Sequence, residues 1–309
     1  MRKNLYGFLC LCILLSCGHG DDSSQDEGYY TISSNTVTSD FTISLSQNTP
    51  AGLGTLLNKV QGSYGEAILN ICTWALIDSK HALANSHCLS DKLIKDPSQN
   101  CSETISGVFS DGSGNKEERN CKRVIKASKY TDNLKFKSQD YAVIELSKPI
   151  TTVKPFNFKR DGVSEGEELT LHAMDHRQSA SKSIQSSYNP KSCTVYSSDT
   201  LGTVNSTGSS PLPVFENCEV IKGNSGSPLT NNQNNLVGVI SLGINEKIIS
   251  KAFDKLERDA GVMTNLKCLP FGINKYDKDI EENCSTENGT NSNDRIAKEY
   301  KDYVAKKEE

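Results

Sequence analysis

Residues 223–228 read GNSGSP, and together with NSHC at residues 85–88 they decide the fold that we expect. Ser225 lies between two glycines, which permit backbone angles that other residues resist, so the turn can expose the hydroxyl. The same turn can aim the backbone amides of Gly223 and Ser225 at one point, where they would stabilise an oxyanion. The alternative is a glycine-serine turn with no chemistry, because short motifs also occur by chance.

A serine nucleophile needs a base, and His87 is the candidate. It precedes Cys88, and a disulfide from Cys88 to Cys72 would hold it at a strand end. Other histidines lack that framing. Asp140 opens the apolar run 141–146 (YAVIEL), where its carboxylate could be buried against the imidazole, fix the tautomer and stabilise the imidazolium. The alternative for Asp140 is a strand-capping residue.

The N-terminus has the features of an export signal. Residues 1–4 are basic, and residues 5–15 form an apolar run that is too short for a permanent membrane anchor. Residues 14–18 (LLSCG) resemble a bacterial lipobox, which predicts a lipoprotein signal peptide over residues 1–17 and lipidation of Cys17. The alternative is an ordinary signal peptide cut after Gly18 or Gly20. Gly18 favours the bacterial outer membrane or cell surface, with a secreted or periplasmic protein as the alternative.

The cysteines indicate an oxidising compartment. Eight of them follow the leader, and an even number in an exported chain is typical of a disulfide framework. Counting does not determine connectivity, but we expect sequential pairing: Cys72–Cys88, Cys101–Cys121, Cys193–Cys218 and Cys268–Cys284. A metal site is the competing interpretation. The sequence has no C-x-x-C pair, and its histidines do not cluster with cysteines, so we expect no metal and no other cofactor.

The body of the chain has the pattern of an all-β protein. Short apolar runs alternate with Gly, Asn, Asp, Ser and Pro clusters from residue 51 to 270, which predicts one barrel or sandwich, or two small packed barrels. Residues 18–50 are polar and suit a flexible tether. Helical periodicity at residues 245–259 and near the C-terminus predicts helices, the second within a disulfide-linked extension over residues 271–309. The net charge of −4 provides no basic surface for nucleic acid.

Five blocks, in order, resemble the trypsin/chymotrypsin family of serine proteases, closer to its bacterial glutamyl-endopeptidase-like branch. They are residues 84–88 (TAAHC in the family), 140–146 (DIALL), 223–228 (GDSGGP), 241–243 (SWG) and 261–266 (GVYTRV). The resemblance implies two six-stranded antiparallel β-barrels, here with a C-terminal helical extension. It also implies that His87, Asp140 and Ser225 are catalytic and that the Gly223 and Ser225 amides form the oxyanion hole.

The resemblance also suggests residues that bind substrate. Ser241, Leu242 and Gly243 match the segment that pairs with substrate backbone, and Glu219 stands where trypsin has its pocket-floor acid. The alternative for Glu219 is a solvated loop residue. We make no prediction of which substrate residue is preferred on the N-terminal side of the cleaved bond.

Two departures from the family pattern are visible. Asn85 and Ser86 replace two alanines before the histidine. Asn224 replaces the aspartate that pairs with a newly freed N-terminus in zymogen-activated relatives, and no IVGG-like sequence precedes Cys72. We therefore predict that activity needs no cleavage to a new N-terminus.

These observations predict a secreted, membrane-anchored serine endopeptidase that acts on proteins or peptides as a monomer through an acyl-enzyme. The alternative is a catalytically inactive protease-fold lipoprotein used for adhesion or binding. A serine hydrolase acting on esters would use the same three residues.

Overall fold

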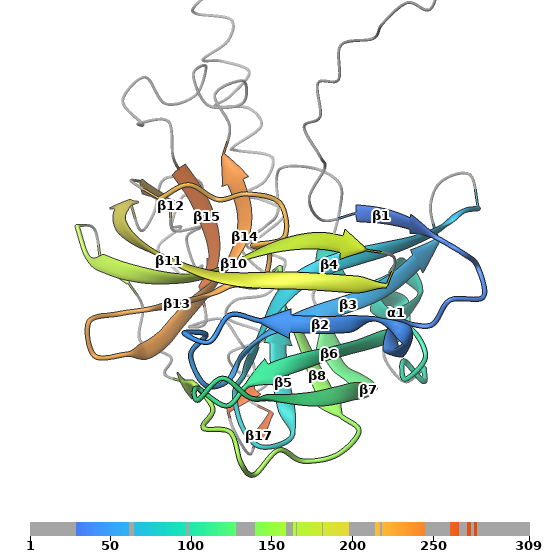
Figure 1. The fold of residues 1–309 in the computed structure, drawn as a ribbon. Coiled ribbons are helices and arrows are strands. Elements are labelled where there is room, and N and C mark those ends of the chain that lie inside the picture. Colours follow the sequence, from blue (N-terminus) through green and yellow to red (C-terminus); the bar gives the residue numbers. More distant parts are fainter. Residues whose placement is uncertain are drawn as a thin grey trace, which may run out of the picture.

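The computed structural model describes residues 29–61, 65–96, 99–127, 140–158, 163–164, 166–180, 182–197, 214–216, 218–244, 260–265, 271–272 and 275–276. Two large β-sheets form this part of the molecule (Figure 1). Its helical elements are α1 (Asp91–Lys95) and the 3-10 turns η1 (Thr38–Asp40) and η2 (Ser86–Cys88). None of the described helices is long and apolar enough to cross a membrane. The fold is all-β, as the sequence predicts.

The first sheet closes into a six-stranded antiparallel barrel. Its strands follow the order β4, β3, β6, β7, β8, β5, and β5 pairs back onto the end of β4. On that same edge of β4, opposite β3, β1 pairs with residues 67–70. The strands are β1 (Tyr29–Ile32), β3 (Leu53–Gln61), β4 (Ala67–Leu76), β5 (His81–Ala84), β6 (Ile105–Ser110), β7 (Lys116–Ala127) and β8 (Ala142–Leu146).

The second sheet also returns on itself. Its antiparallel strands follow the order β10, β13, β14, β15, β12, β11, and β11 pairs back onto β10. Two further strands join it in parallel, β2 on β11 and β9 on β14. The strands are β2 (Thr42–Leu45), β9 (Asn157–Phe158), β10 (Glu168–Ala180), β11 (Ser183–Ser197), β12 (Val214–Glu216), β13 (Pro228–Thr230), β14 (Asn235–Ile244) and β15 (Ala260–Asn265). A separate hairpin pairs β16 (Phe271–Gly272) with β17 (Lys275–Tyr276). The molecule is thus a chymotrypsin-like double barrel.

The core of the first barrel is built around one indole. Trp74 is fully buried, stacks on Phe109 with ring centroids 4.4 Å apart, and donates from Nε1 to the Val108 carbonyl at 3.0 Å. A Cβ placed on Gly54 or on Gly107 would lie 2.7 Å from an atom of this indole. The two glycines therefore provide the space that the tryptophan fills.

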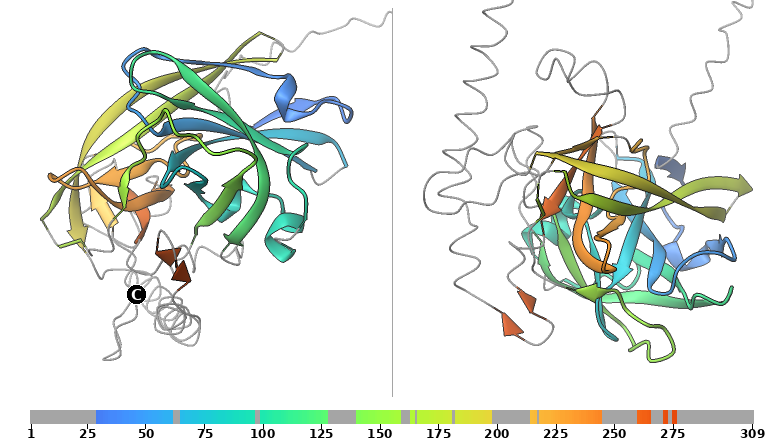
Figure 2. Two further views of the ribbon diagram at one scale, coloured as in Figure 1. Left: turned by 90° about the horizontal axis from the view of Figure 1, so that it is seen from below. Right: turned by 90° about the vertical axis from the view of Figure 1, so that its left-hand side faces the viewer.

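The two barrels pack face to face, and this junction positions the site. One apolar cluster combines Leu83 and Val143 of the first barrel with Leu236 and Val239 of the second. The long β10–β11 hairpin extends over the first barrel, where β10 contacts β3 and β4 (Figures 1 and 2). Side chains from both barrels can therefore meet in the space between them.

The N-terminal segment differs from the expected tether. Of the predicted flexible residues 18–50, the structure describes 29–50, and these include β1 on the first barrel and β2 on the second. Phe41 and Ile43 alternate with polar residues and are buried in a shared apolar cluster. The low average hydrophobicity of this stretch conceals a period-two pattern, which is why the interpretation as a tether was wrong here.

Three of the four expected disulfides lie in the described residues, and the structure contains all three: Cys72–Cys88, Cys101–Cys121 and Cys193–Cys218. The fourth pair, Cys268–Cys284, lies outside the described residues. So do the leader with Cys17, the helix expected over residues 245–259, and the helix expected near the C-terminus.

Candidate active site

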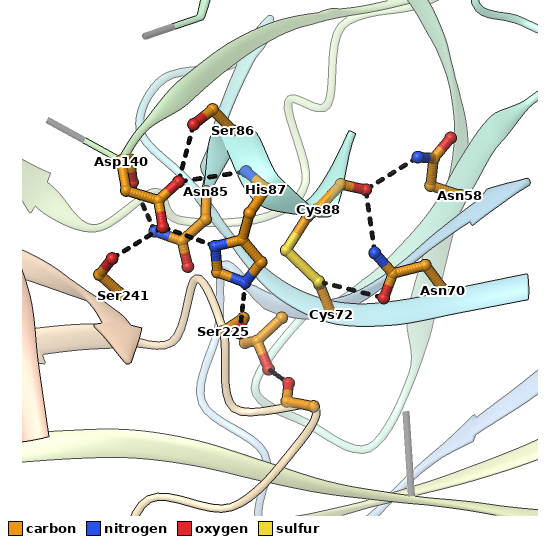
Figure 3. Close-up of a disulfide and its surroundings, with 12 residues drawn as sticks. Asn58, Asn70, Cys72, Asn85, Ser86, His87, Cys88, Asp140, Ser225 and Ser241 are labelled. Atoms are coloured by element: carbon orange, nitrogen blue, oxygen red, sulfur yellow. Dashed lines mark hydrogen bonds and ion pairs between the residues drawn. A yellow bond between two sulfur atoms is a disulfide. The ribbon is translucent and has the colours of Figure 1, made fainter. Parts of the chain in front are cut away.

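The structure brings His87, Asp140 and Ser225 into one hydrogen-bonded line (Figure 3). His87 Nδ1 lies 2.5 Å from Asp140 Oδ2, and His87 Nε2 lies 2.7 Å from Ser225 Oγ. The first two residues meet because β5 and β8 pair antiparallel with Ala84 opposite Ala142, and each residue lies just beyond that pair. Ser225 comes from the turn before β13 of the second barrel. The arrangement can transfer a proton from the serine hydroxyl to the imidazole.

The turn that carries His87 is anchored to the strands of the first barrel. The Cys72–Cys88 disulfide ties η2 to β4, as the sequence predicts. The Cys88 carbonyl accepts hydrogen bonds from Asn58 Nδ2 at 2.8 Å and from Asn70 Nδ2 at 3.4 Å (Figure 3). Because this backbone is held by a covalent link and two amides, the position of the imidazole is fixed by the barrel wall.

Asp140 is buried among donors. Its Oδ1 accepts from the Ser86 hydroxyl at 2.7 Å and from the His87 backbone amide at 3.1 Å, and its Oδ2 accepts from the Ser241 hydroxyl at 2.7 Å (Figure 3). Burial alone would raise the pKa of this carboxyl, but the charge of His87 and the hydrogen bonds outweigh it and lower the pKa to about 2. Asp140 therefore stays ionised at neutral pH.

Two residues that depart from the family pattern contact this aspartate. Ser86 supplies the hydroxyl just described, and Asn85 Nδ2 donates to the Asp140 backbone carbonyl at 2.6 Å. Both residues are fully buried. The sequence marks them only as replacements for two alanines, and it gives no sign of these contacts because the partner lies more than fifty residues away.

The turn around Ser225 depends on its glycines. Gly223 and Gly226 have φ values of 92° and 84°, in the left-handed region that favours glycine. A Cβ on Gly226 would lie 2.2 Å from the Thr73 carbonyl oxygen. Within the described part of the chain, the backbone amides of Gly223 and Ser225 donate to no backbone or side-chain acceptor. They are thus available as the donor pair that the sequence predicts.

Asn224 between these residues is held entirely by backbone. Its side chain is buried, its Nδ2 donates to the Met174 carbonyl at 2.9 Å, and its Oδ1 accepts from the Ile221 amide at 3.0 Å. Both ends of the amide are therefore paired with neighbouring strands and turns of the second barrel.

The four residues expected to bind substrate lie in different parts of the second barrel. Glu219 is exposed on the surface, where Lys191 Nζ bonds its carbonyl at 2.7 Å and lies 3.4 Å from its carboxylate. Its exposure and its pairing with Lys191 agree with the solvated loop residue considered as the alternative, and a role for Glu219 in substrate binding stays a prediction. Ser241 directs its hydroxyl to Asp140. The backbone of Leu242 and Gly243 continues β14 and pairs with residues 261–262 of β15.

Within the described residues, no group of three or more His, Cys, Asp or Glu side chains is arranged to hold a metal ion. The groups that the structure brings together at the site are the serine hydroxyl, the imidazole, the carboxylate and the backbone amides.

A double β-barrel with serine, histidine and aspartate aligned at its junction defines a chymotrypsin-fold serine protease. The family model described as Trypsin matches residues 53–254, well over half of the chain, so this chain belongs to the trypsin family.

Two solved structures are similar to this chain. The first is neuropsin, a serine protease expressed in the limbic system of mouse brain, with 17% identity, 72% of this chain and 92% of that chain covered, and a TM-score of 0.49. The second is the MamO protease domain of Magnetospirillum magneticum in its apo form, with 15% identity, 72% and 95% covered, and a TM-score of 0.43. No curated protein matches the sequence.

Proposed function

We propose that the chain is an active serine endopeptidase that hydrolyses peptide bonds through an acyl-enzyme. The observation that carries the proposal is the contact of 2.7 Å between His87 Nε2 and Ser225 Oγ, with Asp140 bonded to the other ring nitrogen. This is the geometry that a serine nucleophile needs for activation. The trypsin family membership implies protein or peptide substrates.

The mechanism follows from these positions. Ser225 Oγ attacks the peptide carbonyl carbon while His87 Nε2 takes the hydroxyl proton, and Asp140 stabilises the resulting imidazolium. The amides of Gly223 and Ser225 stabilise the oxyanion of the tetrahedral intermediate. His87 then donates its proton to the leaving amine, and an acyl-enzyme forms. Water attacks this ester with His87 again as base, which releases the acid product and restores Ser225.

The protein is proposed to act outside the cytoplasm, as a monomer tethered by a lipid on Cys17. The basic and apolar leader with LLSCG at residues 14–18 supports export and lipidation, and disulfides such as Cys72–Cys88 support an oxidising compartment. Metabolic labelling with palmitate is the test. The wild type should take up label and fractionate with membranes, whereas Cys17→Ala should do neither. Equal behaviour of the two proteins contradicts lipidation at this residue.

Activity is tested by labelling the folded protein with a fluorophosphonate probe, which reacts with an activated serine. The wild type and Ser113→Ala, an exposed serine on the β6–β7 turn, should label equally, and Ser225→Ala should not label. Peptide turnover should fall about 10⁶-fold in Ser225→Ala. A folded wild type that does not label contradicts the proposal and favours a non-catalytic binding protein. Labelling with ester turnover but no peptide turnover favours an esterase.

A further inference from the structure

A chain of buried hydrogen bonds crosses the junction between the barrels and ends at the Gly223 carbonyl. Thr55 Oγ1 on β3 donates to Ser186 Oγ on β11 at 2.8 Å, and Ser186 Oγ lies 2.9 Å from His176 Nδ1 on β10. His176 Nε2 lies 3.3 Å from Thr73 Oγ1 on β4, and Thr73 Oγ1 donates to the Gly223 carbonyl at 3.1 Å. The four side chains are fully buried, so water does not compete for these bonds.

The hydrogen bonds in this series all run in one direction, from Thr55 to the Gly223 carbonyl. Because Thr55 donates to Ser186, the Ser186 hydrogen is directed at His176 Nδ1, which must accept it. The proton of the neutral imidazole then lies on Nε2 and points toward Thr73, whose own hydrogen is given to Gly223. The hydroxyls of Ser186 and Thr73 each accept one hydrogen bond and donate one, and Thr55 begins the series as a donor.

His176 remains neutral in this environment. Burial lowers its pKa to about 4, although a hydrogen bond with the Gly223 backbone and the charge of Asp175 act in the opposite direction. The histidine thus keeps one donor and one acceptor nitrogen at neutral pH. A charged ring would carry hydrogens on both nitrogens and would break the direction of donation at Ser186.

Thr73 holds the catalytic turn at two points. Its hydroxyl donates to the Gly223 carbonyl, and its backbone amide donates to the Ser225 carbonyl at 2.9 Å. The two carbonyls flank Asn224, so the conformation of the whole turn is set from β4 of the opposite barrel. Gly223 at φ 92° has many alternative conformations open to it, and the bond to its carbonyl selects one.

We propose that Thr73 and His176 are positioning residues for the oxyanion hole, because they hold the Gly223 turn in the conformation that presents its amides to the reacting carbonyl. This inference rests on the proposed function. Neither side chain touches the substrate. Their effect is transmitted through the backbone of Gly223, because the bond to its carbonyl restricts the rotation of this residue and so fixes the preceding peptide, which carries the Gly223 amide. That amide stabilises charge in the transition state more than in the bound substrate.

The effect is measured with Thr73→Val, which keeps the side-chain shape and removes the hydroxyl. Loss of one oxyanion donor lowers kcat by about 10²–10³-fold, and a loosened turn should therefore lower it by about 10–100-fold. KM for a peptide substrate should change little, since ground-state binding does not use the hole. Affinity for a peptide aldehyde, which forms a tetrahedral oxyanion adduct on serine, should fall with kcat.

Three controls separate positioning from folding. Thr73→Ser keeps the hydroxyl and should restore kcat, while Thr42→Val, at an exposed threonine on β2, should match the wild type. Urea unfolding shows whether each variant is folded under assay conditions. If Thr73→Val does not fold, His176→Gln takes its place. This substitution removes the imidazole between Ser186 and Thr73 and leaves the hydrogen bond from the Thr73 amide to the Ser225 carbonyl intact.

The outcomes divide clearly. A fall in kcat and aldehyde affinity with KM maintained and rescue by Thr73→Ser supports the inference. Wild-type kcat in folded Thr73→Val, or a change confined to KM or to stability, overturns it and leaves the proposed function standing. If the wild type shows neither turnover nor probe labelling, the proposed function is refuted. The inference that Thr73 positions the oxyanion hole is then refuted as well.

Discussion

Replacing Asp140 by asparagine should remove a specific part of the acid sensitivity of folding. The folded protein lowers the pKa of this buried carboxyl from 3.8 to about 2. A group with a lowered folded pKa contributes stability that is present above its unfolded pKa and is lost as pH falls through the folded one. The difference between the two pKa values corresponds to about 2 kcal/mol, present at neutral pH and mostly lost by about pH 2.

The assay is urea unfolding of the wild type and Asp140→Asn between about pH 5 and pH 2. Other carboxylates titrate in both proteins and cancel in the difference, so the wild type should lose about 2 kcal/mol more than the variant. Ser225→Ala keeps the contact between Asp140 and His87, and it should lose as much as the wild type. Parallel losses in the wild type and Asp140→Asn would refute the reasoning. Turnover by Asp140→Asn at neutral pH should fall about 10⁴-fold.

Three further substitutions test other parts of the structure. Joint replacement of Cys72 and Cys88 by alanine opens a loop with a sequence separation of 16, and urea unfolding should show a loss of about 3 kcal/mol from the gain in unfolded-state entropy. Gly54→Ala places a Cβ 1.9 Å from the Val108 carbonyl oxygen, and thermal unfolding should show a loss of at least about 3 kcal/mol, because the two strands must separate. Ser86→Ala removes a hydrogen bond to a buried carboxylate, and should cost about 1.5–3 kcal/mol in urea at neutral pH. Stabilities equal to that of the wild type would contradict the respective contacts.

Much of the fold could be predicted from the sequence because its signals are local. Short apolar runs bounded by turn residues identify strands, and the run at 141–146 includes all of β8. The residues that meet at the site could also be predicted from the sequence, because each has a local signal. A serine between glycines, a histidine beside a cysteine and an aspartate before an apolar strand each have a distinctive neighbour. Each signal is contained within a few positions.

Other features could not be predicted because they depend on contacts between distant segments. His176 has polar neighbours in sequence, but its partners in space come from β4 and β11. Glu219 has the spacing of a pocket-floor acid, yet the path of the loop places it beside Lys191 on the surface. Spacing along a chain does not determine the direction of a loop, and loop positions are therefore the least reliable part of such a reading.

The departures from the family pattern share one physical property. Asn85, Ser86 and Asn224 are each fully buried, and each side chain donates a hydrogen bond to a group near the site. A buried polar side chain without partners costs free energy, so these replacements for alanine or aspartate are stable only together with their acceptors. Because Asn224 is already paired with the Met174 carbonyl and the Ile221 amide, a new N-terminus would have to break both bonds to reach it. We therefore expect activity before any proteolytic processing within the barrels. Probe labelling of uncleaved protein should equal that of protein cleaved between β2 and β3, and labelling only after cleavage would contradict the argument.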